Sequence, residues 1–109
     1  GAVVHTHPVF ATAFAMAGKT VPDRYLIETK VALKGIALAG YAAPGSDALA
    51  EQVRKVAAGN DAILLQNHGA LTVGHDLVDA FLKMEVLECV AKTIIMSRLV
   101  GDPVAIPEE

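Results

Sequence analysis

Three histidines in two short motifs are the residues of this sequence whose type and spacing could do chemistry. They are His5 and His7 in HTH at positions 5–7, and His68 in QNHG at positions 66–69. Imidazole is the commonest protein ligand for divalent transition metals. Three imidazoles that leave a coordination position open are typical of catalytic rather than structural metal sites. The three histidines therefore indicate metal chemistry.

Both motifs follow apolar runs that predict buried strands, AVV at positions 2–4 and AILL at positions 62–65. Side chains alternate along a strand, so His5 and His7 should share one face about 6.6–6.8 Å apart, where their rings can converge on one ion. A polar strand end explains such a pair about equally well, and a histidine bonded within its own turn explains His68 taken alone. The common position of all three at strand ends favours the metal interpretation.

The rest of the sequence predicts helices that alternate with strands. Pro8 suits the first turn of a helix, Gly18 suits its C-terminal end, and Ser46 can cap a second helix. Gly45 and Ser46 could instead cradle a phosphate, but the cap is the simpler interpretation. Residues 24–35 could form a short helix or a short strand. The fold class is therefore α/β, with helices covering a sheet. The predicted helices are 9–17, 47–58 and 76–100, and the predicted strands are 2–7, 36–41, 61–66 and 70–73.

Length and charge exclude several classes of protein. The 109 residues suffice for one domain, and the net charge of −3 arises from interspersed residues without a basic stripe, so we expect no nucleic-acid partner. No apolar run reaches the roughly 18 residues that a membrane helix needs, so we expect no membrane association. The single cysteine, Cys89, excludes an internal disulfide and suits a reducing cytoplasm. Its place in the apolar rhythm of the last helix predicts a buried side chain.

The chain is unusually apolar for its size. Charged residues make up 19% of it, against about 25% in typical soluble domains. A small domain has a large surface for its volume and should need more polar residues rather than fewer. Either the subunits of an oligomer or a further part of the same protein would cover the extra apolar surface. The sequence opens in a strand-like run without an initiator Met, and we take this as a sign of a fragment.

Other polar residues have ordinary structural explanations. His75 lies beside Asp76 at the expected start of the last helix, where a polar residue assists capping, so we interpret it as structural or solvated. Glu85 and Glu88 could form a carboxylate pair, but their spacing to Lys92 is typical of a solvated helix face. Nothing in the sequence supports Lys92 as a Schiff-base residue.

Taken together, the motifs VVHTHP, GS, LLQNHG and TVG and the long last helix resemble the class II aldolase/adducin family. Within that family they are most similar to zinc-dependent sugar-phosphate aldolases of the L-fuculose-1-phosphate type. The resemblance implies that His5, His7 and His68 ligate zinc, or another divalent metal. It also implies a three-layer α/β/α sandwich with a mostly antiparallel central sheet, incomplete in this chain. Residues 1–101 would be the C-terminal part of the domain, and residues 102–109 an extended tail.

The implied activity is retro-aldol cleavage of a ketose 1-phosphate to dihydroxyacetone phosphate and an aldehyde. Three neutral ligands leave the metal its full Lewis acidity, which would stabilise the enediolate that the cleavage leaves. In the family, the glutamate acid/base and the phosphate-binding residues lie upstream of the position of Gly1, so the catalytic residues stay unknown here and this chain alone is expected to be inactive. Tyr25 lies about one residue out of register with an active-site tyrosine of some members, and a packing role is the alternative.

Several related functions stay open at this point. A pentulose-phosphate 4-epimerase and a methylthioribulose-phosphate dehydratase use the same scaffold, and their distinguishing residues would lie upstream. A non-catalytic adducin-like binding domain is the alternative from a different class, but such domains lose the histidine set. The resemblance further implies a small phosphorylated sugar as substrate and a homo-oligomer, with a tetramer as the expected state. The single cysteine leads us to expect a cytoplasmic protein.

Overall fold

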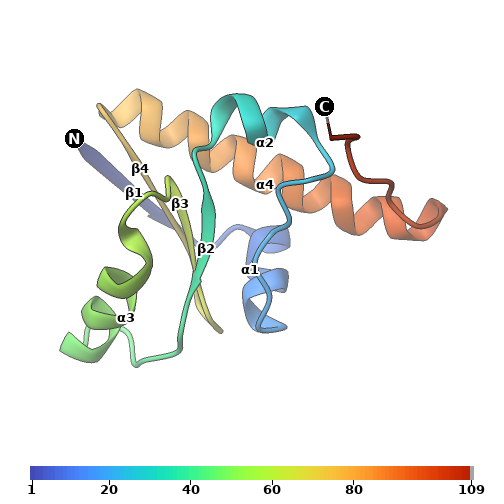
Figure 1. Cartoon of the computed structure of the whole chain (residues 1–109). Helices are drawn as coiled ribbons and strands as arrows, with labels where there is room; N and C mark the ends of the chain where they lie inside the picture. The colour runs from blue at the N-terminus through green and yellow to red at the C-terminus, as the bar shows by residue number, and fades with distance from the viewer. Residues whose placement is uncertain (109) are drawn as a thin grey trace.

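A mixed four-stranded sheet forms the centre of the fold in the computed structural model, which describes residues 1–108 (Figure 1). The strand order is β1-β4-β3-β2. β4 pairs antiparallel with both β1 and β3, whereas β2 pairs parallel with β3, so the sheet is mixed but mostly antiparallel, as the family resemblance implied. The strands are β1 (Ala2–Thr6), β2 (Ile36–Ala39), β3 (Ala62–Leu65) and β4 (Gly69–Gly74).

Helices cover both faces of this sheet and give the expected three layers. They are α1 (Val9–Met16), α2 (Ile27–Ala32), α3 (Asp47–Ala57) and α4 (Leu77–Val100). α1 and α4 pack on one face, where α2 contacts α4, and α3 packs on the other face against β2 and β3 (Figure 1). The larger core, on the side of α1 and α4, centres on residues such as Leu64, Leu87 and Ile94, whereas Ile63 and Leu65 pack toward α3. Because side chains alternate along β3, this strand contributes residues to both cores.

The predicted elements are confirmed within one or two residues at their ends. The ambiguous segment 24–35 contains a helix, α2, rather than a strand. Ser46 caps α3, because its hydroxyl oxygen accepts a hydrogen bond from the Leu49 N–H at 3.1 Å. Gly18 follows α1 in a left-handed conformation with φ 70°, as a glycine after a helix C-cap commonly does.

Two interpretations of α4 were wrong. Cys89 is exposed rather than buried, because the buried face of α4 runs through Ala80, Met84, Leu87, Val90 and Ile94 and leaves position 89 on the opposite side. Glu88 does not belong to a purely solvated face: its side chain is half-buried and bonds to α1. Among residues 1–108, no helix is long and apolar enough to cross a membrane.

Candidate metal centre

The fold brings the three histidines of the two motifs together. The ring centroids of His5 and His7 are 5.1 Å apart, those of His5 and His68 5.0 Å, and those of His7 and His68 4.9 Å. One nitrogen from each ring lies within 4.8 Å of the others. The cause is the strand register: β1 pairs with β4 so that Thr6 lies opposite Ala70, which places the HTH motif beside the turn that carries His68.

A backbone contact fixes the ring of His5. Its Nδ1 lies 2.8 Å from the carbonyl oxygen of Ala70, a group that can only accept a hydrogen bond. Nδ1 therefore carries the proton, and in the neutral ring Nε2 is left with a free lone pair. Metal-ligating histidines are commonly held in this way, because the second hydrogen bond sets both the tautomer and the ring orientation.

The turn between β3 and β4 presents His68. Asn67 adopts a left-handed conformation with φ 61°, one that asparagine tolerates better than most residues. The backbone N–H of His68 donates to the carbonyl of Leu65 at 2.9 Å, which closes the turn. The chain is thereby reversed within three residues, and the imidazole projects toward the end of β1.

The electrostatic environment of His68 favours the neutral ring that binds a metal. Burial, together with the neighbouring rings of His5 and His7, lowers its pKa from the ordinary value. The ring is therefore neutral at physiological pH, and neutral imidazole is the form that binds metals. Its Nδ1 is buried without a hydrogen-bonding partner in residues 1–108. A buried polar nitrogen without a partner is rare and costly, so this ring has bonding capacity that the described residues leave unused.

Gly69 allows the two motifs to approach. A Cβ added at this position would lie 2.6 Å from the carbonyl oxygen of Thr6 and 2.7 Å from Cδ2 of His7. Both distances are too short for any side chain. The glycine of the QNHG motif is therefore required by the closeness of β1.

These observations together fit a divalent transition metal. Metal–nitrogen bonds of about 2.0–2.1 Å require ligand nitrogens nearer than about 4.2 Å to one another. The nitrogens of the cluster approach that range, so small side-chain rotations would bring them onto one ion. With only three neutral protein ligands, coordination positions would stay open for a substrate.

The other histidine and the tyrosine candidate lie apart from this cluster. His75 is highly exposed, and its Nδ1 lies 3.0 Å from a carboxylate oxygen of Asp79, in keeping with a structural or solvated role. The hydroxyl of Tyr25 accepts a hydrogen bond from the guanidinium of Arg24 at 3.0 Å. Tyr25 borders a cavity of about 200 Å³ together with Leu26, Thr93, Ile94, Ser97, Pro103 and Val104, so this chain does not bring it to the histidines.

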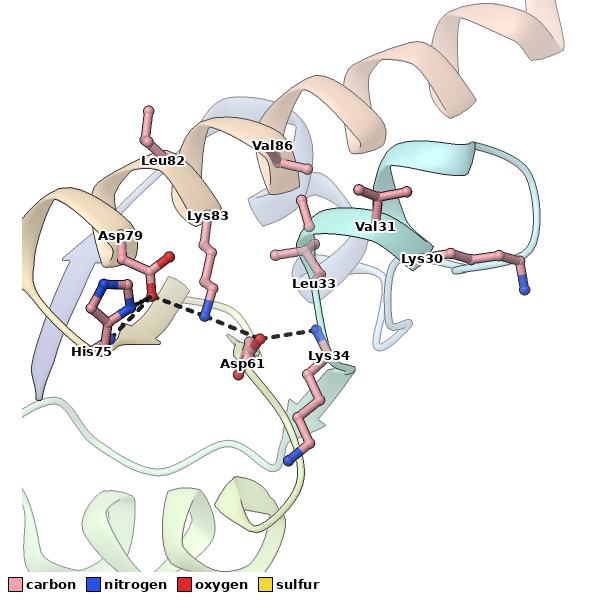
Figure 2. Close-up of a pocket in the computed structure, with 11 residues that line it drawn as sticks. Lys30, Val31, Leu33, Lys34, Asp61, His75, Asp79, Leu82, Lys83 and Val86 are labelled. Atoms are coloured by element: carbon pink, nitrogen blue, oxygen red, sulfur yellow. Dashed lines mark hydrogen bonds and ion pairs between the residues drawn. The ribbon is translucent and has the colours of Figure 1, made fainter.

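Sequence reasoning missed an ion-pair network in an open pocket of about 650 Å³, which lies between α2, the N-terminal half of α4 and the start of β3 (Figure 2). The ammonium of Lys83 lies 3.2 Å from carboxylate oxygens of both Asp61 and Asp79. Asp61 also accepts a hydrogen bond from the backbone N–H of Lys34 at 3.0 Å. The i,i+4 spacing of Asp79 and Lys83 could have revealed one pair, but the contact with Asp61 depends on the tertiary fold.

The structure combines a layered α/β/α fold with a three-histidine cluster at its strand ends. Residues 1–95 match the family described as Class II Aldolase and Adducin N-terminal domain. The chain belongs to this family.

Individual relatives are similar over most of this chain. An L-fuculose phosphate aldolase of Methanococcus maripaludis strain C7 is 41% identical over 91 residues, which cover 84% of this chain and 49% of the relative. A 3-oxo-tetronate 4-phosphate decarboxylase of Escherichia coli K12 is 33% identical over 97 residues, which cover 85% and 46%. A solved L-fuculose 1-phosphate aldolase superposes with a TM-score of 0.87 at 30% identity and covers 97% of this chain and 50% of its own. The chain thus spans about half the length of the curated relatives it matches.

Proposed function

We propose that this chain is the metal-binding part of a zinc-dependent sugar-phosphate aldolase. The substrate would be a ketose 1-phosphate, cleaved to dihydroxyacetone phosphate and an aldehyde. The observation that carries the proposal is the convergence of His5, His7 and His68, with the His5 ring already held in the tautomer that leaves Nε2 free. The names of the aldolase relatives support the substrate class.

Each histidine would have a defined task in this reaction. His5 would present Nε2 because the Ala70 carbonyl holds its Nδ1 proton. His68 would present a neutral ring because burial and its two neighbours disfavour its charged form. A zinc ion held by these ligands supplies Lewis acidity toward a substrate carbonyl. Since none of the three ligands is charged, none would offset that acidity.

Proton transfer would need a further group. We propose that it comes from a glutamate upstream of the position of Gly1, as the resemblance implies. Tyr25 is the second candidate, and a Tyr25→Phe variant of the full-length protein tests it. Metal content should stay unchanged, because the hydroxyl of Tyr25 bonds Arg24 rather than the histidine cluster. A fall in kcat at unchanged metal content would assign Tyr25 to proton transfer, and an unchanged kcat would leave it a packing residue.

The metal proposal is tested on full-length protein by measuring bound metal and retro-aldol cleavage of L-fuculose 1-phosphate. We expect about one zinc ion per chain in the wild type, and a loss of both zinc and cleavage in His68→Ala. His75→Ala is the matched control, because this histidine is exposed and lies outside the cluster. Wild-type protein without metal, or a His68→Ala variant that keeps its metal, would contradict the proposal.

A decarboxylase is the second candidate function, since one relative at 33% identity carries that name. Decarboxylation beside a carbonyl also leaves an enediolate-type anion, so the same three histidines would serve it. An epimerase, a dehydratase or a non-catalytic adducin-like domain would use or adapt the same scaffold. Assays with a ketose 1-phosphate and with a 3-oxo-tetronate 4-phosphate distinguish the aldolase from the decarboxylase, because only the second substrate releases carbon dioxide.

We further propose a cytoplasmic homo-oligomer, with a tetramer as the expected state.

A further inference from the structure

We propose that Glu88 is a positioning residue of the three-histidine site, which sets the place of His7 through the start of α1. The proposal rests on the metal-binding function proposed above. Glu88 lies in the middle of α4, yet both of its carboxylate oxygens bond to α1. Oε2 accepts the N–H of Phe10 at 2.9 Å, and Oε1 accepts the N–H of Ala11 at 2.8 Å.

The sequence before α1 explains why a carboxylate from another helix caps the first turn of α1. The N-cap position of α1 is Pro8, which has no side-chain acceptor and forms no capping hydrogen bond. The first N–H groups of a helix have no partner within the helix. Glu88 meets two of them, and its negative charge suits the positive end of the helix dipole. Such charge-assisted bonds are stronger than neutral ones.

This clamp lies close to His7 along a stiff stretch of chain. Only Pro8 and Val9 separate His7 from the first clamped amide, and the ring of Pro8 fixes its φ, here at −70°. Within residues 1–108, neither ring nitrogen of His7 forms a hydrogen bond, in contrast to Nδ1 of His5. The position of His7 therefore depends on its backbone more than on a partner for its ring.

A second contact joins the same two helices. The ammonium of Lys92, one turn beyond Glu88, lies 5.6 Å from the ring centroid of Phe10. This distance falls within the range of a cation–π interaction. Glu85, by contrast, is exposed on the same helix and forms no hydrogen bond or ion pair within the described chain. The two glutamates therefore form a matched pair for experiment.

The test measures Co²⁺ and Zn²⁺ affinity in full-length wild type and in the variants Glu88→Ala, Glu88→Gln and Glu85→Gln, each first shown by circular dichroism to be folded. We expect the Kd for metal to rise about 10-fold or more in Glu88→Ala, the range seen when groups behind metal ligands are removed. Glu88→Gln should rise less, because its single amide oxygen still accepts one of the two N–H bonds. Glu85→Gln should match the wild type.

Two spectroscopic readouts separate positioning from a general loss of stability. The visible absorption of bound Co²⁺ should change in Glu88→Ala, and the amide protons of Phe10 and Ala11 should shift upfield in NMR spectra. If wild-type protein binds metal and Glu88→Ala binds it with the same affinity and spectrum, the positioning role is overturned while the proposed function stands. If wild-type protein binds no metal, both fail, even where the two amide shifts confirm the clamp itself.

Discussion

At the scale of single residues, Gly69 is the position where the metal site is most sensitive to one added carbon. A Cβ there would lie 2.6 Å from the Thr6 carbonyl oxygen and 2.7 Å from the ring of His7. We expect Gly69→Ala to lower the free energy of unfolding by about 1–3 kcal/mol, the usual cost of overpacking. It should also weaken metal binding, because β1 and the histidine turn must move apart. Urea denaturation and metal titration measure the two effects.

Gly101 provides the control for this substitution. It has an extended backbone with φ 171°, and an added Cβ would meet nothing within 4 Å. Gly101→Ala should leave both stability and metal affinity near those of the wild type. If both alanine variants had the same stability and metal affinity, neither property would depend on the close approach of β1 to the histidine turn.

At the scale of elements, α3 depends on its N-cap. The Ser46 hydroxyl oxygen accepts the Leu49 N–H, and Leu49 packs with the core residues Ile63 and Leu65. We expect Ser46→Ala to lower the free energy of unfolding by about 0.5–2 kcal/mol, the usual cost of losing such a cap. Thermal or urea denaturation measures this, and Ser46→Asp should restore most of the stability because it keeps an acceptor oxygen. An equally large loss in Ser46→Asp would contradict the capping explanation.

The start of α4 should respond to pH through Asp79 and Lys83. The backbone N–H of His75 and the ammonium of Lys83 lower the pKa of Asp79 against the effect of burial (Figure 2). Burial alone would lower the pKa of Lys83, but hydrogen bonds and charges from Asp61 and Asp79 outweigh it and raise that pKa. Asp79 therefore stabilises the fold above its unfolded pKa of about 3.9, and this contribution is lost as pH falls through the folded pKa.

Lys83 acts in the opposite direction. Its contribution to the free energy of unfolding is complete below its unfolded pKa of about 10.4 and is lost as pH rises through the folded pKa.

The acid limb can be tested at Asp79. We expect Asp79→Asn to flatten the fall of unfolding free energy between about pH 5 and pH 2, as measured by urea denaturation. The control is Asp102→Asn, since Asp102 is exposed in the segment after α4. An unchanged acid profile in Asp79→Asn would show that the charge of Asp79 contributes nothing to stability.

At the scale of the whole molecule, a metal ion would join parts of the chain that are distant in sequence. His5 lies in β1 and His7 directly follows this strand, whereas His68 lies in the turn between β3 and β4. A ligand that binds only the folded state adds about 2.7 kcal/mol at a concentration of 100 times its Kd. We therefore expect zinc to raise the melting temperature of the full-length protein and a chelator to reverse the change. His7→Ala should show neither effect, and a zinc-induced rise of equal size in that variant would contradict binding at this cluster.

Much of the fold was predictable because the signals are local. Short apolar runs marked β1 and β3, the apolar rhythm marked α4, and Ser46 marked the start of α3. The boundaries and α2 were less certain, because a six-residue helix carries little periodicity of its own. The neighbouring Leu26 and Leu33, which pack into or against the core, lie just outside it. The exposure of Cys89 was missed for a related reason. An apolar rhythm along a helix shows that one face is buried, but the packing partners decide how wide that face is.

The sequence by itself determined the ligand types and the family: three histidines in HTH and QNHG motifs, and a glycine beside the third. These are properties of residue identity and short spacing, and they needed no coordinates. Only the tertiary structure decided that β1 pairs with β4, so that residues more than 60 positions apart share one cluster. It also decided that Glu88 caps α1 and that Lys83 joins Asp61 to Asp79. Such contacts follow from strand register and helix packing, which depend on the whole core rather than on any one segment of the chain.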